Sequence, residues 1–181
     1  MRAYGAPWGF AGGWAIDLFV GAPTRPHADV DIAVLRADQE KLRRALAGAR
    51  VDKMVGGSRL PWRATEWLTP PTHELHATWP DGAHVELGLN DSDAETADWI
   101  YRRDARIRLP LSRAFRSVGD LPILTPEVVL LFKSKAPAAK DDADLATALP
   151  RLDERSVAWL RDAIVATGGA DHWVEMLSRR G

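Results

Sequence analysis

Two carboxylates near the start of the chain, Asp29 and Asp31, have the residue type and spacing of a metal site. They fall in the segment from Asp29 to Leu35, whose alternating apolar residues predict a strand. Residues two apart on a strand share a face and lie about 7 Å apart along the chain. That separation allows them to hold a pair of hard divalent cations, which prefer oxygen ligands and bind phosphate groups.

Two glycines, Gly12 and Gly13, come before these carboxylates and directly precede an apolar segment, Trp14 to Val20. The segment predicts a helix, and Gly21 suits its left-handed end. Glycine lets the backbone approach a phosphate closely, and free N–H groups at a helix N-terminus favour anions. The glycines therefore offer a place for a phosphate opposite the cations.

The residues between the glycines and the carboxylates complete a longer pattern. It consists of Gly12-Gly13-Trp14-Ala15-Ile16-Asp17, Gly21, Thr24-Arg25, His27, Asp29 and Asp31. This pattern resembles the aminoglycoside 2''-adenylyltransferases and their uncharacterised relatives, which belong to the nucleotidyltransferases of the DNA polymerase beta superfamily. The resemblance to the antibiotic enzymes covers mainly residues 12–35.

The resemblance implies a role for each of five residues. Asp29 and Asp31 would hold two Mg²⁺ ions, one of them on a bound nucleoside triphosphate. Gly12 and Gly13 would cradle the β- and γ-phosphates, and Arg25 would help to bind the nucleotide. ATP is the expected co-substrate, with another nucleoside triphosphate left open.

A third carboxylate is expected, because members of this superfamily carry one on a strand beside the Asp-x-Asp strand. The runs Glu74 to Trp79 and His84 to Asn90 flank a turn sequence, Pro80 to Ala83, and predict a β-hairpin. The polar face of its second strand carries Glu86 in mid-strand, which makes Glu86 the candidate metal ligand and proton acceptor. Asp91 is the alternative, and the antibiotic enzymes generally have Asp rather than Glu here.

The second half of the chain also resembles the uncharacterised relatives. Thr125 and the proline after it predict the start of a helix that carries Lys133, and a second helix carries Lys140 and Asp144. By resemblance, Lys133 would bind the triphosphate, and Asp144 would orient the triphosphate or the acceptor hydroxyl. For Lys140 with Asp144, an ion pair on a solvated helix face remains the alternative.

The positions of His73 and His76 do not predict a metal site. His73 and His76 fall on opposite faces if their segment is a strand, so they cannot chelate one zinc ion together. His27 lies two residues before Asp29 in the family pattern, and we expect it to hydrogen-bond the aspartates.

Composition narrows the class of protein. The 181 residues have a net charge of −1 and contain no cysteine. The absence of long basic runs argues against a nucleic-acid partner, and the apolar runs are too short to span a membrane. We expect a cytoplasmic α/β protein with a mixed sheet flanked by helices: a nucleotidyltransferase palm in residues 1–110 and a helical region packed on it in residues 111–181.

The sequence therefore predicts an enzyme that moves a nucleoside monophosphate, AMP in the first instance, to a hydroxyl of a small molecule such as an aminoglycoside-like antibiotic. Two alternatives remain open: a toxin of the AbiEii type that modifies tRNA, and a degenerate module that binds a nucleotide without catalysis. In the relatives a helix precedes the first strand, whereas only eleven residues precede Gly12 here, so we expect either a misassigned start codon or another chain, as in an oligomer, that covers that face of the sheet. Residues 51–72 give no clear pattern and are expected to be loop or part of an acceptor pocket.

Overall fold

The computed structural model describes residues 4–180. Their strands form a mixed sheet in the order β4-β3-β5-β6-β2-β1-β10-β9. Off this path, β7 pairs with β6, and β8 pairs with β7. The strands are β1 (Trp8–Phe10), β2 (Asp31–Leu35), β3 (Arg50–Val55), β4 (Ser58–Pro61), β5 (Glu74–Thr78), β6 (His84–Asp93), β7 (Asp98–Ile100), β8 (Arg108–Pro110), β9 (Phe115–Val118) and β10 (Leu121–Leu124). The pairs β2–β6 and β1–β10 are parallel and the other pairs antiparallel, which confirms the expected mixed α/β fold.

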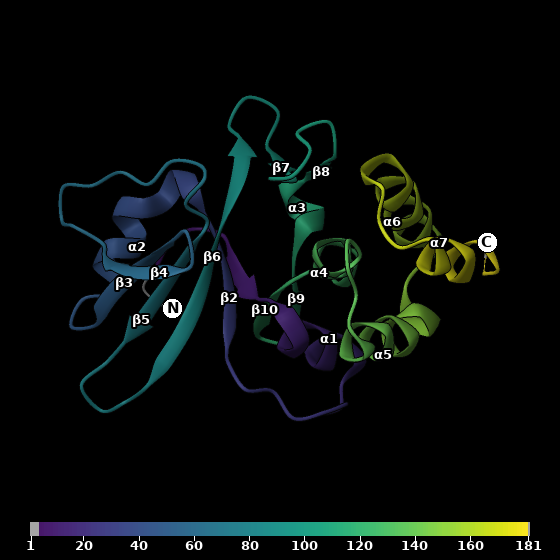
Figure 1. Cartoon of the computed structure of the whole chain (residues 1–181), viewed down its shortest axis with the longest axis horizontal. Coiled ribbons are helices and arrows are strands. Elements are labelled where there is room, and N and C mark those ends of the chain that lie inside the picture. The colour runs from purple at the N-terminus through teal and green to yellow at the C-terminus, as the bar shows by residue number, and fades with distance from the viewer. Residues whose placement is uncertain (1–3, 181) are drawn as a thin grey trace.

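The helices cover the two faces of the sheet unequally (Figure 1). They are α1 (Gly12–Val20), α2 (Gln39–Ala45), α3 (Leu111–Ala114), α4 (Pro126–Lys133), α5 (Ala139–Ala148), α6 (Glu154–Thr167) and α7 (Asp171–Ser178), with 3-10 turns at Arg36–Asp38 and Leu149–Arg151. Helix α2 covers one face, near β3, β4 and β5, whereas α1, α4, α5, α6 and α7 lie on the opposite face. Within residues 4–180, the helices are too short or too polar to cross a membrane.

Strand β2 shows how the sheet separates two hydrophobic cores. Ile32 and Val34 pack in the core on the α2 side, together with Leu42. Ala33 packs in the other core, with Ile16 of α1 and residues of α4 and α6. Because side chains alternate along a strand, the odd-numbered Asp31 must share the α1 face with Ala33.

Helix α4 begins at Pro126, directly after Thr125, as the sequence predicts. Asp153 caps α6 by accepting a hydrogen bond from the backbone N of Ser156 at 2.7 Å, and Gly168 ends the helix in the left-handed conformation. Strands β9 and β10 come after residue 110 but pair within the sheet, so residues 111–181 are not wholly helical, and the C-terminal run of longer helices begins with α4. We keep the division at residue 110 as a proposal about folding units.

Three sequence expectations are wrong. Strand β2 begins at Asp31, because Asp29 lies in the bend before it. Residues 51–72 are not all loop: they contain most of a β3–β4 hairpin that turns at two glycines with positive φ. The residue type of Trp67 favours core packing, but 52% of its surface is exposed.

Candidate active site

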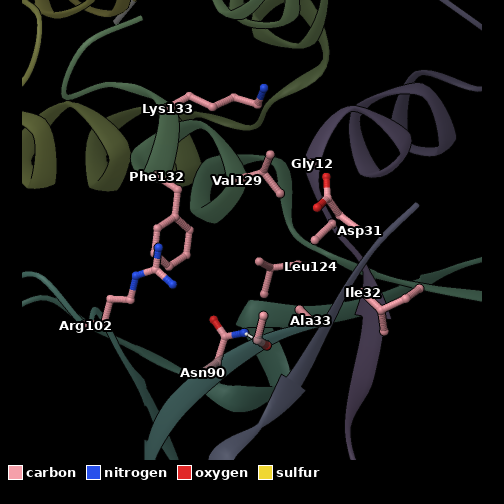
Figure 2. A pocket seen from close by; sticks show the side chains of 12 residues that line it. Gly12, Asp31, Ile32, Ala33, Asn90, Arg102, Leu124, Val129, Phe132 and Lys133 are labelled. Atoms are coloured by element: carbon pink, nitrogen blue, oxygen red, sulfur yellow. Dashed lines mark hydrogen bonds between the residues drawn. The ribbon is translucent and has the colours of Figure 1, made fainter. Parts of the chain in front are cut away.

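A cavity of about 270 Å³ opens between α1, β2, β6 and α4 on the helix-rich face of the sheet (Figure 2). It is lined by Ala11, Gly12, Asp31, Ile32, Ala33, Gly88, Asn90, Arg102, Leu124, Val129, Phe132 and Lys133. Three of these, Gly12, Asp31 and Lys133, are residues to which the sequence assigned a role. The fold therefore brings together parts of the chain more than a hundred residues apart.

Asp31 is the first residue of β2 and points its carboxylate into this cavity. Its register partner on β6 is Glu86, so the two carboxylates stand on neighbouring strands. Burial, followed by the negative charges of Asp29 and Glu86, raises the pKa of Asp31 from 3.8 to about 6. The site holds more negative charge than the nearby Lys133 offsets, which suits a hard divalent cation bound by oxygen ligands.

The surroundings of Asp29 differ from those of Asp31. It is exposed, it precedes the strand, and its backbone carbonyl accepts a hydrogen bond from the Trp14 indole N–H at 3.0 Å. The expectation that both carboxylates share one strand face is therefore wrong, because a bend interrupts the strand between them. Asp29 is still close enough for its charge to raise the pKa of Asp31.

The two glycines sit where a side chain would not fit. Gly12 has φ of 55°, and a Cβ there would lie 1.9 Å from Oδ2 of Asp31. A Cβ on Gly13 would lie 2.3 Å from the ring of His27. Both residues form the first turn of α1, where backbone N–H groups have no partner within the helix. The backbone at Gly12 thus approaches Asp31 closely and offers donors for an anion.

The loop between α1 and β2 is held by Asp17, which is buried. Oδ1 of Asp17 accepts hydrogen bonds from the backbone N of Thr24 at 3.1 Å and from its hydroxyl at 2.5 Å, and Oδ2 lies 2.6 Å from Nε2 of His27. Although burial alone would raise the pKa of Asp17, hydrogen bonds from Thr24 and His27 hold it below its usual range. The expectation that His27 bonds the aspartates of the metal site is wrong, because Asp17 is its partner.

Arg25, Lys133 and Asp144 meet as one ion-pair network between that loop, α4 and α5. Arg25 donates from Nε and Nη2 to the two oxygens of Asp144, at 3.0 and 3.1 Å. Nζ of Lys133 lies 3.0 Å from the same carboxylate and 2.5 Å from Asp141. Asp144 is 1% exposed, and its buried charge is balanced by two cations. This network fixes Lys133 at the wall of the cavity.

The two alternatives for the third carboxylate have different surroundings. Glu86 faces the side of the sheet that carries Asp31 and contributes to its raised pKa. Asp91 instead pairs with Nε of Arg36, and Nη1 of the same guanidinium donates to the carbonyl of Thr72 at 2.6 Å. This geometry favours Glu86 over Asp91.

Arg102, Asn90 and Phe132 are among the lining residues to which the sequence assigned no role. The Arg102 guanidinium lies 5.0 Å from the centre of the Phe132 ring, on the side of the cavity away from Asp31. Asn90 accepts a hydrogen bond from the Trp99 indole at 2.9 Å. Phe132 fits the apolar pattern of its helix, and Arg102 is one of four arginines within residues 102–108, so neither residue has a distinct signal in the sequence.

Comparisons with known proteins identify a family and similar folds. A family model described as aminoglycoside-2''-adenylyltransferase matches residues 1–107. The crystal structure of the lincosamide antibiotic adenylyltransferase LnuA, bound to lincomycin, matches with a TM-score of 0.51 and 17% identity over 78% of this chain and 84% of that chain. The solution structure of the antibiotic-resistance factor ANT(2'')-Ia matches with a TM-score of 0.55 and 17% identity, over 88% of this chain and 82% of that chain. The search of curated proteins gave no match. At this identity the two structures show a shared fold.

Proposed function

Because the chain belongs to the aminoglycoside-2''-adenylyltransferase family, it is a nucleotidyltransferase, and we propose that it moves AMP from ATP to a hydroxyl of a small molecule. An aminoglycoside-like antibiotic is the acceptor class that the family suggests first, and the lincomycin-bound relative adds lincosamides. The observation that carries the proposal is the carboxylate of Asp31, which faces the backbone of Gly12 in a cavity that Lys133 also lines.

The donor set fits Mg²⁺. Asp31, Asp29 and Glu86 are carboxylates, and burial together with the charges of Asp29 and Glu86 raises the pKa of Asp31. Two Mg²⁺ ions bound there would neutralise triphosphate charge and lower the pKa of the acceptor hydroxyl. Glu86 belongs to this set because it is the register partner of Asp31 on the neighbouring strand.

The residues of the chain bind and orient the reactants. In the proposed complex the backbone N–H groups of Gly12 and Gly13 donate to the β- and γ-phosphates. Lys133 donates to the triphosphate, and Asp144, itself paired with Arg25, holds the lysine side chain in position. The acceptor oxygen attacks the α-phosphorus as the bond to pyrophosphate breaks. Glu86 accepts the hydroxyl proton, and the protein contributes mainly by positioning and charge neutralisation.

The direct test is a pyrophosphate-release assay with ATP, Mg²⁺ and a panel of aminoglycosides and lincosamides, with mass spectrometry of the acceptor. We expect an acceptor that gains AMP, and loss of transfer in Asp31→Asn with the fold retained. Asp162→Asn is the matched control, because Asp162 is an exposed carboxylate in a surface pair with Arg161. Full activity of Asp31→Asn would contradict the assignment.

Calorimetric titration of ATP, with and without Mg²⁺, separates the remaining alternatives. Mg²⁺-dependent ATP binding without transfer to any acceptor would indicate a nucleotide-binding module. Transfer to tRNA alone would indicate a toxin-like activity. The net charge of −1 gives no support for a long nucleic-acid partner.

A further inference from the structure

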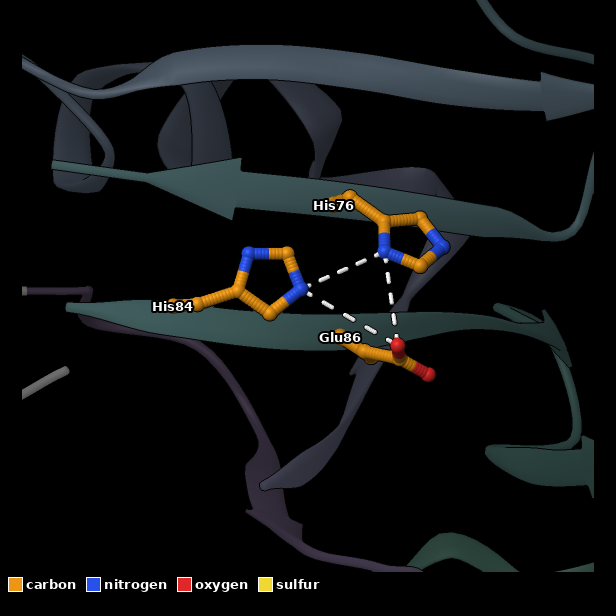
Figure 3. A group of neighbouring side chains, drawn as sticks. All are labelled: His76, His84 and Glu86. Carbon is orange, nitrogen blue, oxygen red and sulfur yellow. Dashed lines mark hydrogen bonds and ion pairs between the residues drawn. The ribbon is translucent and has the colours of Figure 1, made fainter. Parts of the chain in front are cut away.

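Two histidines lie beside Glu86 on the hairpin of β5 and β6 (Figure 3). His76 is the register partner of Glu86, and Thr78 is the register partner of His84. All four positions therefore share the sheet face that also carries Asp31. We propose that His76, His84 and Glu86 form a binding site for a transition-metal ion such as Zn²⁺, next to the Asp31 site, with Glu86 as the carboxylate that the two sites share.

The three inward-facing atoms have the spacing of metal ligands. Nδ1 of His76 lies 3.4 Å from Nε2 of His84 and 3.4 Å from Oε1 of Glu86. Nε2 of His84 lies 3.9 Å from the same oxygen. One point in the plane of this triangle is about 2.1 Å from all three atoms, which matches the usual Zn–N and Zn–O bond lengths. An ion can therefore enter without movement of the backbone.

The outer nitrogens of both rings are held as in metal sites. Nε2 of His76 lies 2.6 Å from the carboxylate of Glu74, so this nitrogen carries the proton and Nδ1 presents its lone pair to the centre. Nδ1 of His84 lies 2.8 Å from the hydroxyl of Thr78, which can accept a hydrogen bond from Nδ1–H and so leave the lone pair on Nε2. These outer hydrogen bonds orient both imidazoles toward Glu86.

Burial and ligand type favour a transition metal over Mg²⁺. The side chain of His76 is 5% exposed, whereas those of His84 and Glu86 are 31% and 26% exposed. The ion thus has access from solvent, and a water molecule can supply a fourth ligand. Two imidazoles and one carboxylate suit Zn²⁺ or Co²⁺, while Mg²⁺ prefers an all-oxygen set.

Arg59 competes with an ion at this place. Its Nη2 donates to Nδ1 of His76 at 3.1 Å, from the exposed strand β4. Metal binding would replace this hydrogen bond, and the long exposed side chain of Arg59 can move into solvent. His73 takes no part, because its ring is bonded to Arg36. The exclusion of zinc for His73 with His76 therefore does not extend to His76 with His84.

The test is titration of tag-free, full-length protein with Co²⁺, followed by its visible absorption and by calorimetry. We expect one strongly absorbing Co²⁺ per chain, displaced by Zn²⁺. In His84→Gln the Kd should rise at least about tenfold. His172→Gln is the matched control, because His172 is an exposed histidine paired with Asp142 alone, and it should bind as the wild type does.

Two further variants make the result decisive. Arg59→Gln should bind Co²⁺ more tightly than the wild type, and equal or weaker binding would count against the site. Asp31→Asn should keep the Co²⁺ spectrum, because Asp31 is not one of the three ligands. Failure of the wild type to bind Co²⁺, or unchanged binding in His84→Gln, would overturn the proposal while leaving the transfer assay unaffected.

Discussion

Replacing Asp31 by Asn should stabilise the metal-free protein at neutral pH, although it removes the carboxylate proposed to bind Mg²⁺. Asp31 is held in the cavity near Asp29 and Glu86, which carry the same charge. Asparagine has nearly the same shape without the charge. The substitution therefore removes an electrostatic cost that a bound cation offsets in the wild type.

The pKa of Asp31 gives the size of this cost. The carboxyl group has a pKa of 3.8 when unperturbed and about 6 in the folded protein. The folded state thus holds this proton more tightly than the unfolded state, so wild-type stability falls as pH rises from 4 to 6. Each pH unit is worth about 1.4 kcal/mol, which makes the full penalty about 3 kcal/mol above pH 6. Partial exposure to solvent reduces it to about 1–3 kcal/mol.

The assay is urea unfolding of both proteins in the presence of EDTA, at pH 7.5 and at pH 4. Asp31→Asn should exceed the wild type by about 1–3 kcal/mol at pH 7.5, and the difference should nearly vanish at pH 4. Adding Mg²⁺ at pH 7.5 should stabilise the wild type and leave Asp31→Asn unchanged.

The surface variant Asp162→Asn is again the control, and its free energy of unfolding should change by less than about 0.5 kcal/mol at either pH. Equal stability of Asp31→Asn and the wild type at pH 7.5 would refute the reasoning. A difference that grows on acidification would refute it as well, because the sign would be reversed.

Three further substitutions test the cavity and the ion-pair network that holds Lys133 in its wall. Gly12→Ala should lower transfer at least about a hundredfold, because a Cβ 1.9 Å from Asp31 must displace that carboxylate; pyrophosphate release measures this. Arg25→Lys should lower the free energy of unfolding by about 1 kcal/mol, since lysine cannot reproduce the two-point bond to Asp144; urea unfolding measures this. Lys133→Met should raise the Kd for ATP at least about tenfold, as calorimetry would show.

Each of these has a control or a contradicting result. Gly48→Ala also places alanine at positive φ but meets no atom within 4 Å, so it should keep full transfer activity. Wild-type stability of Arg25→Lys would mean that the second hydrogen bond contributes nothing. Unchanged ATP affinity in Lys133→Met would remove Lys133 from the proposed phosphate site.

The local parts of the site could be predicted from the sequence, because short-range patterns determine them. The alternation in β2, the glycine pair at the start of α1 and the hairpin that contains Glu86 each depend on neighbours within a few residues. These features placed Asp31 and Glu86 on adjoining strands. They failed at Asp29, because the chain bends there and β2 begins only at Asp31, although the alternating pattern starts at Asp29.

The long-range contacts could not be predicted in this way. The bidentate pair of Arg25 with Asp144 joins residues 119 positions apart, and no periodicity relates them. His76 and His84 are different, because the hairpin register that aligns Glu86 with His76 also brings His84 close. That signal was present in the sequence, but it required the whole register of the hairpin rather than the position of one strand.

The place of β1 in the sheet has a consequence for synthesis of the protein. Phe10 of β1 is paired with Ile123 of β10, so one edge of the first strand stays unpaired until β10 has been synthesised. At ribosomal rates of about 5–20 residues per second, that delay is on the order of ten seconds. During this time the nascent chain presents an open strand edge, which other chains can join. We expect chaperones to engage the nascent chain in this interval, and chains truncated before β10 to aggregate.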